Sequence, residues 1–160
     1  MTARPLWYAL VLVLAAALGV TGCASWNSED LALPGDDWAS FRRSHSSKPY
    51  RVRGRTYYPL ASSRGYREIG IASWYGSESG DRTASGQRFD PGALSAAHKT
   101  LPLFTTVRVT NLENGRSAVL VVNDRGPFIP GRLIDLSLAA AQRLAMQRRG
   151  SSRVLVEALN

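Results

Sequence analysis

Apolar residues follow three different patterns along this 160-residue chain. From Leu6 to Gly22 they form one stretch without a charged side chain, and from Ala24 to about Lys48 they stand singly among Ser, Pro, Gly and charged residues. From Pro49 onward, runs of alternating apolar and polar positions begin. We therefore divide the chain into an N-terminal apolar segment (1–22), a flexible tether (23–48), an extended lead-in (49–66) and one folded domain (67–160).

The alternation predicts several short β-strands in the folded domain. They are expected at Ile69–Tyr75, Thr105–Asn111, Ala118–Val122 and Val154–Ala158. The Asn114-Gly115 pair between the second and third strands is typical of a tight turn, so these two strands should form a hairpin. In the lead-in, tyrosine and valine residues on both sides of Gly54 indicate a shorter hairpin before Pro59.

One segment has the pattern of an α-helix. Ser137 has the chemistry of an N-cap, and residues 138–146 follow it with Leu136, Ala140 and Leu144 on one stripe. We expect this helix to end before Gly150, and Ala93–His98 to form a helical turn or a short bridge. Many short strands with a single clear helix favour a small closed β-barrel over a layered α/β sheet.

The N-terminal segment has the features of an export signal. Arg4 precedes an apolar stretch that is too short to span a bilayer comfortably, and Val20-Thr21-Gly22 places small residues before Cys23. This arrangement resembles the lipobox of bacterial lipoproteins, which predicts lipidation at Cys23, the only cysteine of the chain. The alternative is an ordinary signal peptide with an incidental cysteine. Ala24 after the cysteine favours the outer membrane over retention at the inner membrane.

The formal net charge of +8 narrows the choice of partners. Outside the cytoplasm, a basic surface meets anionic glycan, lipid and cell-wall polymer, although such a charge can also serve solubility alone. The chain has no zinc-ligand spacing, no aromatic-glycine RNA signature and no basic helix, so we expect no nucleic-acid partner.

Two polar loops interrupt the barrel pattern and hold the candidate chemistry. The first includes residues 82–90, and the second begins at Asn123-Asp124-Arg125, directly after the most apolar strand. Polar groups at the end of a buried strand are costly unless they are hydrogen-bonded or functional. A partly buried carboxyl at Asp124 would have a raised pKa, as a general acid requires.

Several motifs in order resemble the rare lipoprotein A family over residues 49–159. They are Gly70-Ile-Ala-Ser-Trp-Tyr-Gly76, Thr83-Ala-Ser-Gly86, Ala96-Ala-His-Lys-Thr-Leu-Pro102, Val107-Arg-Val-Thr-Asn-Leu112, Asn114-Gly-Arg116, Asn123-Asp-Arg-Gly-Pro-Phe128 and Ile134-Asp-Leu-Ser137. The resemblance implies a mainly β fold, a six-stranded double-psi β-barrel with one or two short helices, distantly like expansins and some endoglucanases.

The resemblance also implies a lytic transglycosylase that acts on peptidoglycan lacking stem peptides. In that reaction the muramyl C6 hydroxyl, rather than water, closes on the anomeric carbon and leaves a 1,6-anhydro end. Asp124 matches the family's catalytic aspartate, first acid and then base, and His98 matches the active-site histidine that would hydrogen-bond Asp124 or the sugar. The residues expected to bind substrate are Gln87, Asn123, Arg125, Thr83, Ser85 and Tyr75.

The chain departs from the family pattern in three respects. Gln87 stands where a glutamate is common, and glutamine cannot transfer a proton at neutral pH, so Asp90, Glu78 and Asp81 are candidates to take its place. The preceding polar loop is a residue shorter than usual and lacks a Phe-His pair. We also expect no C-terminal peptidoglycan-binding SPOR domain.

Three functions remain open from the sequence. The leading one is an endolytic transglycosylase in the cell envelope, held by lipid on the periplasmic face of the outer membrane. The second is a non-catalytic, expansin-like module that binds peptidoglycan, which Gln87 favours. The third is a division-associated protein whose barrel contacts other proteins. In each case we expect a monomer without a cofactor or a metal.

Overall fold

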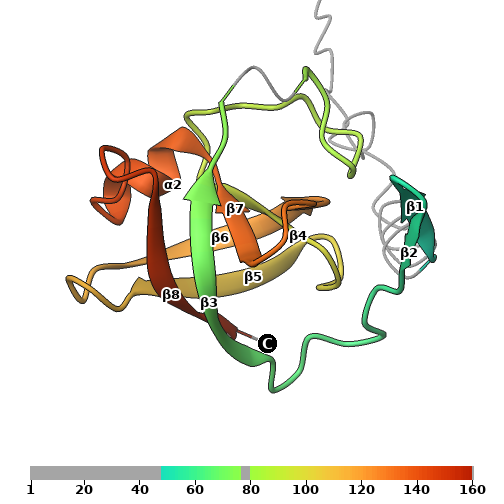
Figure 1. The fold of residues 1–160 in the computed structure, drawn as a ribbon, viewed down its shortest axis with the longest axis horizontal. Helices are drawn as coiled ribbons and strands as arrows, with labels where there is room; N and C mark the ends of the chain where they lie inside the picture. Colours follow the sequence, from blue (N-terminus) through green and yellow to red (C-terminus); the bar gives the residue numbers. More distant parts are fainter. Residues whose placement is uncertain (1–47, 77–79, 160) are drawn as a thin grey trace, which may run out of the picture. The chain divides into compact units, whose positions relative to one another are not determined.

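The computed structural model describes residues 48–76 and 80–159, and its main feature is a closed β-barrel (Figure 1). The barrel strands are β3 (Arg67–Trp74), β4 (Ser95–His98), β5 (Thr105–Asn111), β6 (Ser117–Asp124), β7 (Arg132–Leu136) and β8 (Ser151–Ala158). They follow the order β3-β7-β4-β6-β5-β8 around the barrel. The expected six-stranded double-psi β-barrel is confirmed.

The order of the strands around the barrel differs from their order in the sequence, and two of the neighbouring pairs are parallel. β3 runs parallel to β7, and β4 runs parallel to β6, whereas all the other neighbours are antiparallel. The β5–β6 hairpin is the one predicted from Asn114-Gly115, with Val107 opposite Leu120 and Val109 opposite Ala118. Parallel neighbours need long crossovers, and these supply the loops on which the candidate chemistry lies.

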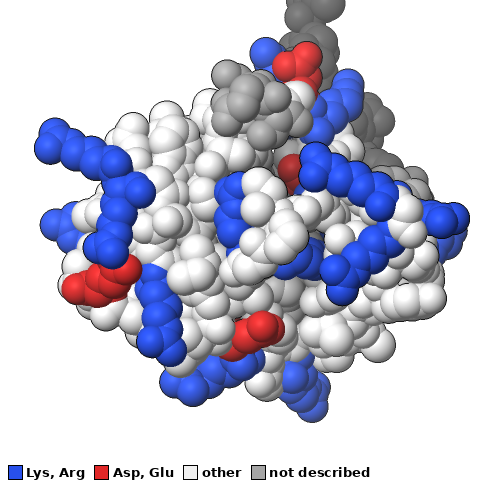
Figure 2. Space-filling model, viewed as in Figure 1, with Lys and Arg blue, Asp and Glu red and all other residues white. Residues whose placement is uncertain are grey.

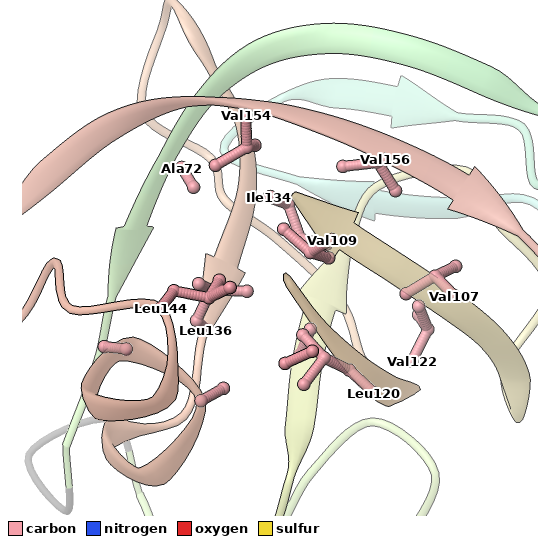
Figure 3. Packing of buried hydrophobic residues seen from close by; sticks show 14 of the residues in the cluster. Ala72, Val107, Val109, Leu120, Val122, Ile134, Leu136, Leu144, Val154 and Val156 are labelled. Atoms are coloured by element: carbon pink, nitrogen blue, oxygen red, sulfur yellow. The ribbon is translucent and has the colours of Figure 1, made fainter. Parts of the chain in front are cut away.

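The barrel interior is filled by branched aliphatic side chains (Figure 3). On β5, buried positions alternate with more exposed ones, as predicted, and Val107 and Val109 are fully buried. The same cluster includes Ala140 and Leu144 from the helical segment. Burial of each such aliphatic side chain contributes about 1.5–3 kcal/mol, so this cluster is the main source of stability.

Helix α2 (Leu138–Arg143) is shorter than the sequence predicted. Its N-cap is Ser137, as expected, and the Ser137 hydroxyl accepts a hydrogen bond from Ala140 N. The helix ends early because the Leu144 carbonyl accepts hydrogen bonds from the side-chain amides of Asn111 (3.1 Å) and Asn114 (3.0 Å). Tertiary partners thus satisfy a carbonyl that a longer helix would have used itself.

Two strands were not predicted. Ala93–His98, expected as a helical turn or a short bridge, contains β4, whose four residues are all buried. Burial on both faces removes the alternation by which a strand is recognised, and alanine has little strand preference. The other missed strand is β7, and Leu136, which we had placed on the helix stripe, belongs to it.

The lead-in forms the expected hairpin. β1 (Tyr50–Val52) and β2 (Arg55–Tyr57) make a separate two-stranded antiparallel sheet. The signal segment, the tether and Cys23 lie outside the described residues. Within residues 48–76 and 80–159, no helix is both long enough and apolar enough to cross a membrane.

A close approach between β3 and β7 yields the first prediction. A Cβ atom at Gly70 would lie 2.6 Å from Leu133 Cβ, closer than two carbon atoms can approach. Gly70→Ala should therefore lower the free energy of unfolding by about 1–3 kcal/mol in urea titrations. In a Leu133→Gly background the same substitution should cost at least about 1 kcal/mol less, and equal costs in both backgrounds would contradict this explanation.

Candidate active site

Asp124 is the last residue of β6, and backbone N–H groups bind only one of its two carboxyl oxygens. Oδ1 accepts hydrogen bonds from the backbone N–H groups of Ala84 (2.7 Å) and Arg125 (2.7 Å). Oδ2 accepts none from the described residues. Because both N–H groups require an acceptor, a proton on this carboxyl group would reside on Oδ2. The geometry thus fixes which oxygen could donate a proton.

The electrostatic surroundings of Asp124 favour its protonated form. Burial raises the pKa of this carboxyl group, whereas the N–H groups of Ala84 and Arg125 and the charge of Arg125 lower it, and the effect of burial is larger. The phenols of Tyr50 and Tyr75 also lie within electrostatic range of Asp124. A buried carboxyl group whose ionisation is disfavoured has the character of a general acid.

The first polar loop folds around its own side chains. The Thr83 and Ser85 hydroxyls lie 2.9 Å apart, and the Ser85 hydroxyl donates to Gln87 Oε1 (3.3 Å). Thr83 N donates to the Gln87 carbonyl (2.9 Å), so residues 83–87 form a compact turn. Gly86 allows this turn because its φ of 82° is unfavourable for other residues.

The same loop is fastened to the end of β6. Asn123 Nδ2 donates to Gln87 Oε1 (3.2 Å), and Ser85 N donates to the Asn123 carbonyl (3.1 Å). Together with the bond between Ala84 N and Asp124, these contacts bring the two predicted polar loops into one site. Gln87 Oε1 is an acceptor for two donors, which is a role that a glutamate carboxylate could also fill.

Two buried polar atoms beside Asp124 have no hydrogen-bond partner among the described residues. They are the Tyr75 hydroxyl and Asn123 Oδ1. The Tyr75 ring is stacked on Phe89, with 4.9 Å between ring centroids, so the direction of its hydroxyl is fixed. Buried polar groups are almost always paired in proteins, so these two atoms are candidates for contact with a polar ligand.

His98 lies near the site but makes different contacts from those expected. Its Nδ1 accepts hydrogen bonds from Thr100 N (3.1 Å) and Leu101 N (2.9 Å), and its Nε2 lies 2.9 Å from the Tyr66 hydroxyl. The expected hydrogen bond to Asp124 is not made, because both ring nitrogens are occupied. Since Nδ1 accepts, Nε2 carries the proton and donates to Tyr66, whose own hydroxyl donates to Glu68 (2.7 Å).

Arg125 connects His98 to Asp124 through the backbone. Arg125 Nη1 donates to the carbonyls of His98 (3.2 Å) and Leu101, and its backbone N–H donates to Asp124 Oδ1. Burial lowers the pKa of Arg125 from its high ordinary value, but an arginine guanidinium stays charged in proteins. Two backbone carbonyls thus help to hold this half-buried charge in place.

The sequence reasoning missed a second buried carboxyl group, that of Asp135. Ala97 of β4 pairs with Asp124 on one side and with Asp135 on the other, which places the two aspartate backbones roughly 10 Å apart, twice the spacing between strands. Burial raises the pKa of Asp135, opposed by the charges of Arg132 and Lys99. Its position in the Ile134-Asp-Leu-Ser137 motif was the available signal.

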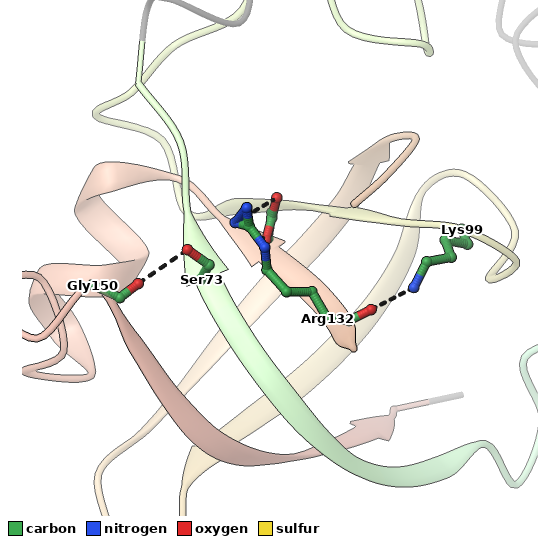
Figure 4. Close-up of polar contacts among 5 residues, drawn as sticks. Ser73, Lys99, Arg132 and Gly150 are labelled. Atoms are coloured by element: carbon green, nitrogen blue, oxygen red, sulfur yellow. Dashed lines mark hydrogen bonds and ion pairs between the residues drawn. The ribbon is translucent and has the colours of Figure 1, made fainter. Parts of the chain in front are cut away.

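Asp135 belongs to a small charged cluster on the barrel. Arg132 Nη1 lies 3.3 Å from Asp135 Oδ1, and Lys99 Nζ donates to the Arg132 carbonyl (Figure 4). Asp135 also lies within electrostatic range of Tyr75. The Tyr75 hydroxyl therefore faces the charges of both buried aspartates.

Two of the carboxylates expected as substitutes for a glutamate at position 87 are exposed, and one of these is hydrogen-bonded within its own turn. Asp90 Oδ1 accepts from Gly92 N (2.8 Å) within its own turn, and both Asp90 and Asp81 are exposed. Glu78 lies outside the described residues. Among residues 48–76 and 80–159, no group of three or more His, Cys, Asp or Glu side chains could hold a metal ion.

Basic side chains outnumber acidic ones on the face of the molecule drawn in Figure 2. Many lysine and arginine side chains lie on the side where β1 and β2 lie in Figure 1, and the rest of the face is largely uncharged. This distribution favours polyanionic or neutral partners over cationic ones.

The buried position of His98 yields the second prediction. Burial, with smaller effects from Lys99 and Arg125, lowers the pKa of His98 from 6.5 to about 3. Between these values the unfolded chain binds a proton that the folded chain does not, so the free energy of unfolding should fall as the pH falls through this range. In ¹⁵N NMR, His98 should remain the neutral Nε2–H tautomer from pH 8 to 4, with the signal assigned by a His45→Gln variant.

A His98 midpoint near 6.5 in the folded protein would contradict this reading. The matched measurement is urea unfolding of a His98→Gln variant, whose stability should depend less steeply on pH below 6.5.

The sequence of the barrel is similar to those of known proteins. Residues 67–156 match a family model described as lytic transglycolase. The chain is 46% identical over 140 residues to a Pseudomonas aeruginosa protein named endolytic peptidoglycan transglycosylase RlpA, covering 87% of this chain and 41% of that protein. It is 40% identical over 153 residues to a Campylobacter jejuni protein of the same name, covering 92% of this chain and 56% of that protein.

Among solved structures, the barrel is similar to Streptomyces papain inhibitor, with a TM-score of 0.51 and 25% identity over 60% of this chain and 96% of that one. The barrel fold by itself therefore does not define an activity. The chain spans only about half the length of the relatives that share its sequence. Because the family model nevertheless matches more than half of the chain, from the start of β3 into β8, the chain belongs to the lytic transglycolase family of double-psi β-barrel proteins.

Proposed function

We propose that this protein is a lytic transglycosylase that cleaves the glycan strands of peptidoglycan in the bacterial cell envelope. The names of its relatives support the substrate and the reaction. The observation that carries the proposal for this chain is the Asp124 carboxyl group, with Oδ1 bound by two backbone N–H groups and Oδ2 bound by none of the described residues. Such a group can present a single proton in one direction.

In the first step Asp124 acts as a general acid. The proton on Oδ2 moves to the glycosidic oxygen, and the bond between that oxygen and the anomeric carbon of the muramyl sugar breaks. The leaving strand departs with a hydroxyl group. Asp124 becomes a carboxylate, and the N–H groups of Ala84 and Arg125 and the charge of Arg125 stabilise this form.

In the second step the same carboxylate acts as a base. It accepts the proton of the muramyl C6 hydroxyl, whose oxygen forms a bond to the anomeric carbon and closes the 1,6-anhydro ring. The proton returns to Asp124, and no water is consumed. A second carboxylate to activate water, which inverting glycosidases need, is therefore not required.

The neighbouring polar residues are assigned to binding and support. The Tyr75 hydroxyl can donate to the sugar and Asn123 Oδ1 can accept from it, because neither atom has a hydrogen-bond partner within residues 48–76 and 80–159. Gln87, Thr83 and Ser85 hold the loop that supplies Ala84 N to Asp124. We assign His98 to positioning, because its carbonyl holds Arg125 while its ring is engaged elsewhere.

We further propose that Cys23 is lipidated and holds the protein at the periplasmic face of the outer membrane as a monomer. The lipobox-like sequence before Cys23 supports the lipid, and Ala24 supports the outer membrane. Release of the Cys23→Ser variant from membranes, with the unchanged chain retained, would test the anchor.

The reaction is tested with purified sacculi, both intact and stripped of stem peptides. Mass spectrometry should detect 1,6-anhydromuramyl products from the unchanged protein. Asp124→Asn should lower their release by at least about 100-fold, because asparagine keeps the acceptor for the two N–H groups but cannot transfer a proton. Glu157→Gln also replaces a carboxylate by an amide, but in a surface ion pair with Arg67, so it should leave the rate unaltered.

The alternative, a peptidoglycan-binding module without activity, predicts a different result. The protein would sediment with sacculi and release no anhydro products. Product release that survives Asp124→Asn would instead leave the transglycosylase reaction in place and remove Asp124 from it.

Gln87 yields a separate prediction. A glutamate at this position would accept the same bonds from Ser85 and Asn123 and would place a negative charge near Asp124. A like charge raises the pKa of a carboxyl group, so Asp124 would stay protonated to higher pH. Gln87→Glu should therefore shift the basic limb of the pH–rate profile upward, whereas Gln87→Leu, which removes the acceptor, should lower the rate at every pH.

A further inference from the structure

The β1–β2 hairpin is not a strand pair of the barrel. Its strands have three residues each, and their register pairs Tyr50 with Tyr57. The turn contains Arg53 and Gly54 with φ values of 48° and 78°, which suit a tight hairpin. A two-stranded hairpin of this size is only marginally stable alone, so side-chain contacts with the barrel must fix its place. It also precedes residue 67, where the family match begins.

Those contacts converge on the loop that follows Asp124. The rings of Tyr50 and Tyr57 are stacked, with 5.3 Å between centroids, and both contact Phe128, at 6.3 Å and 5.4 Å. The Tyr50 hydroxyl donates to the Lys99 carbonyl (2.7 Å), just beyond His98 at the end of β4. Tyr50 thus joins two segments of the candidate active site that are far apart in sequence.

Tyr50 also covers the arginine beside Asp124. The Arg125 guanidinium carbon lies 5.5 Å from the centroid of the Tyr50 ring, in a cation–π contact. The same guanidinium donates through Nη1 to the carbonyls of His98 and Leu101. Arg125 is therefore enclosed between the hairpin and the barrel, and its backbone N–H holds Asp124 Oδ1.

We propose that the β1–β2 hairpin is part of the active site, with Tyr50 as a positioning residue that covers Arg125 and keeps water from Asp124. This inference rests on the proposed function for its reaction. The effect of Tyr50 on the ionisation of Asp124, however, can be measured without catalysis. A hairpin that merely packs on the barrel would contribute to stability and leave the ionisation of Asp124 unchanged.

The electrostatics of the site give the direction of the expected change. The groups that face Asp124 are Arg125 from its own loop, Tyr50 from β1 and Tyr75 after β3. Burial raises the pKa of Tyr50 to about 12, and it also raises that of Tyr75, so both phenols are neutral at physiological pH. The largest effect on Asp124 is burial, which raises its pKa. Removal of the Tyr50 ring admits water, so the pKa of Asp124 should fall.

The test uses the full chain with substitutions at two tyrosines. Tyr50→Leu removes the ring over Arg125, and Tyr50→Phe keeps the ring but removes the hydrogen bond to Lys99. Tyr58→Leu is the matched control. It makes the same substitution directly after β2 of the same hairpin, at a side chain that is 68% exposed. The titration of the Asp124 carboxyl carbon is followed by ¹³C NMR and assigned with Asp124→Asn.

Tyr50→Leu should lower the Asp124 midpoint by about one pH unit, which corresponds to about tenfold less of the protonated acid at any pH above the midpoint. The basic limb of the pH–rate profile on sacculi should move down by the same amount. Tyr50→Phe should show a smaller shift, and Tyr58→Leu should show none.

Unchanged Asp124 titration in both Tyr50 variants, with only a lower melting temperature, would overturn the inference. If Tyr50→Leu fails to fold, Tyr50→Phe decides by the same titration. Absence of anhydro products from the unchanged protein would refute the proposed function alone, because the titration would still show whether the hairpin controls Asp124.

Discussion

The position of β4 between β6 and β7 is the constraint on which the barrel and the site both depend. β4 is parallel to β6 and antiparallel to β7, and its pairing closes the barrel. Ala96 faces the core, while Ala97 joins a separate small cluster with Tyr75 and Phe89. Because both alanines are small, the neighbouring strands can carry their larger side chains close together on each side of β4. The same register that closes the core thus places Asp124 and Asp135 on either side of Ala97.

The site balances a desolvation cost against a few directed hydrogen bonds. Removal of a carboxylate from water is expensive, and at Asp124 the cost is only partly offset by two N–H groups and the charge of Arg125. Full compensation would leave this carboxyl group with its ordinary pKa, and no compensation at all would raise the pKa further. A partial balance lets the group exist in both forms, which a residue that is first acid and then base requires. His98 shows the opposite outcome, since its buried ring is committed to one neutral tautomer.

The sequence predicted those parts of the fold that carry a local signal. Three such predictions were correct, and each depends on a few neighbouring residues alone. They are the alternation at Val107 and Val109, the Asn114-Gly115 turn and the Ser137 N-cap. β4 was missed because a strand that is buried on both faces has no alternation of apolar and polar residues. The helix was predicted too long because the side chains of Asn111 and Asn114, which are distant in sequence, bind the Leu144 carbonyl at its end. The two polar loops were recognised, but their closeness depends on parallel pairing. No sequence pattern indicated that both His98 nitrogens would be occupied or that Tyr50 would cover Arg125.

The bond between Ala84 N and Asp124 Oδ1 joins a long polar loop to the end of a rigid strand. Hydrogen bonds to an ionised acceptor are roughly twice as strong as those to a neutral one. If Asp124 donates its proton as proposed, the loop is therefore held more tightly after the donation than before it. The grip on the substrate strand would be firmest during the short interval in which the anhydro ring closes, and it would relax when the proton returns. Proton transfer at Oδ2 and the hold of the loop at Oδ1 would then be timed by one and the same carboxyl group.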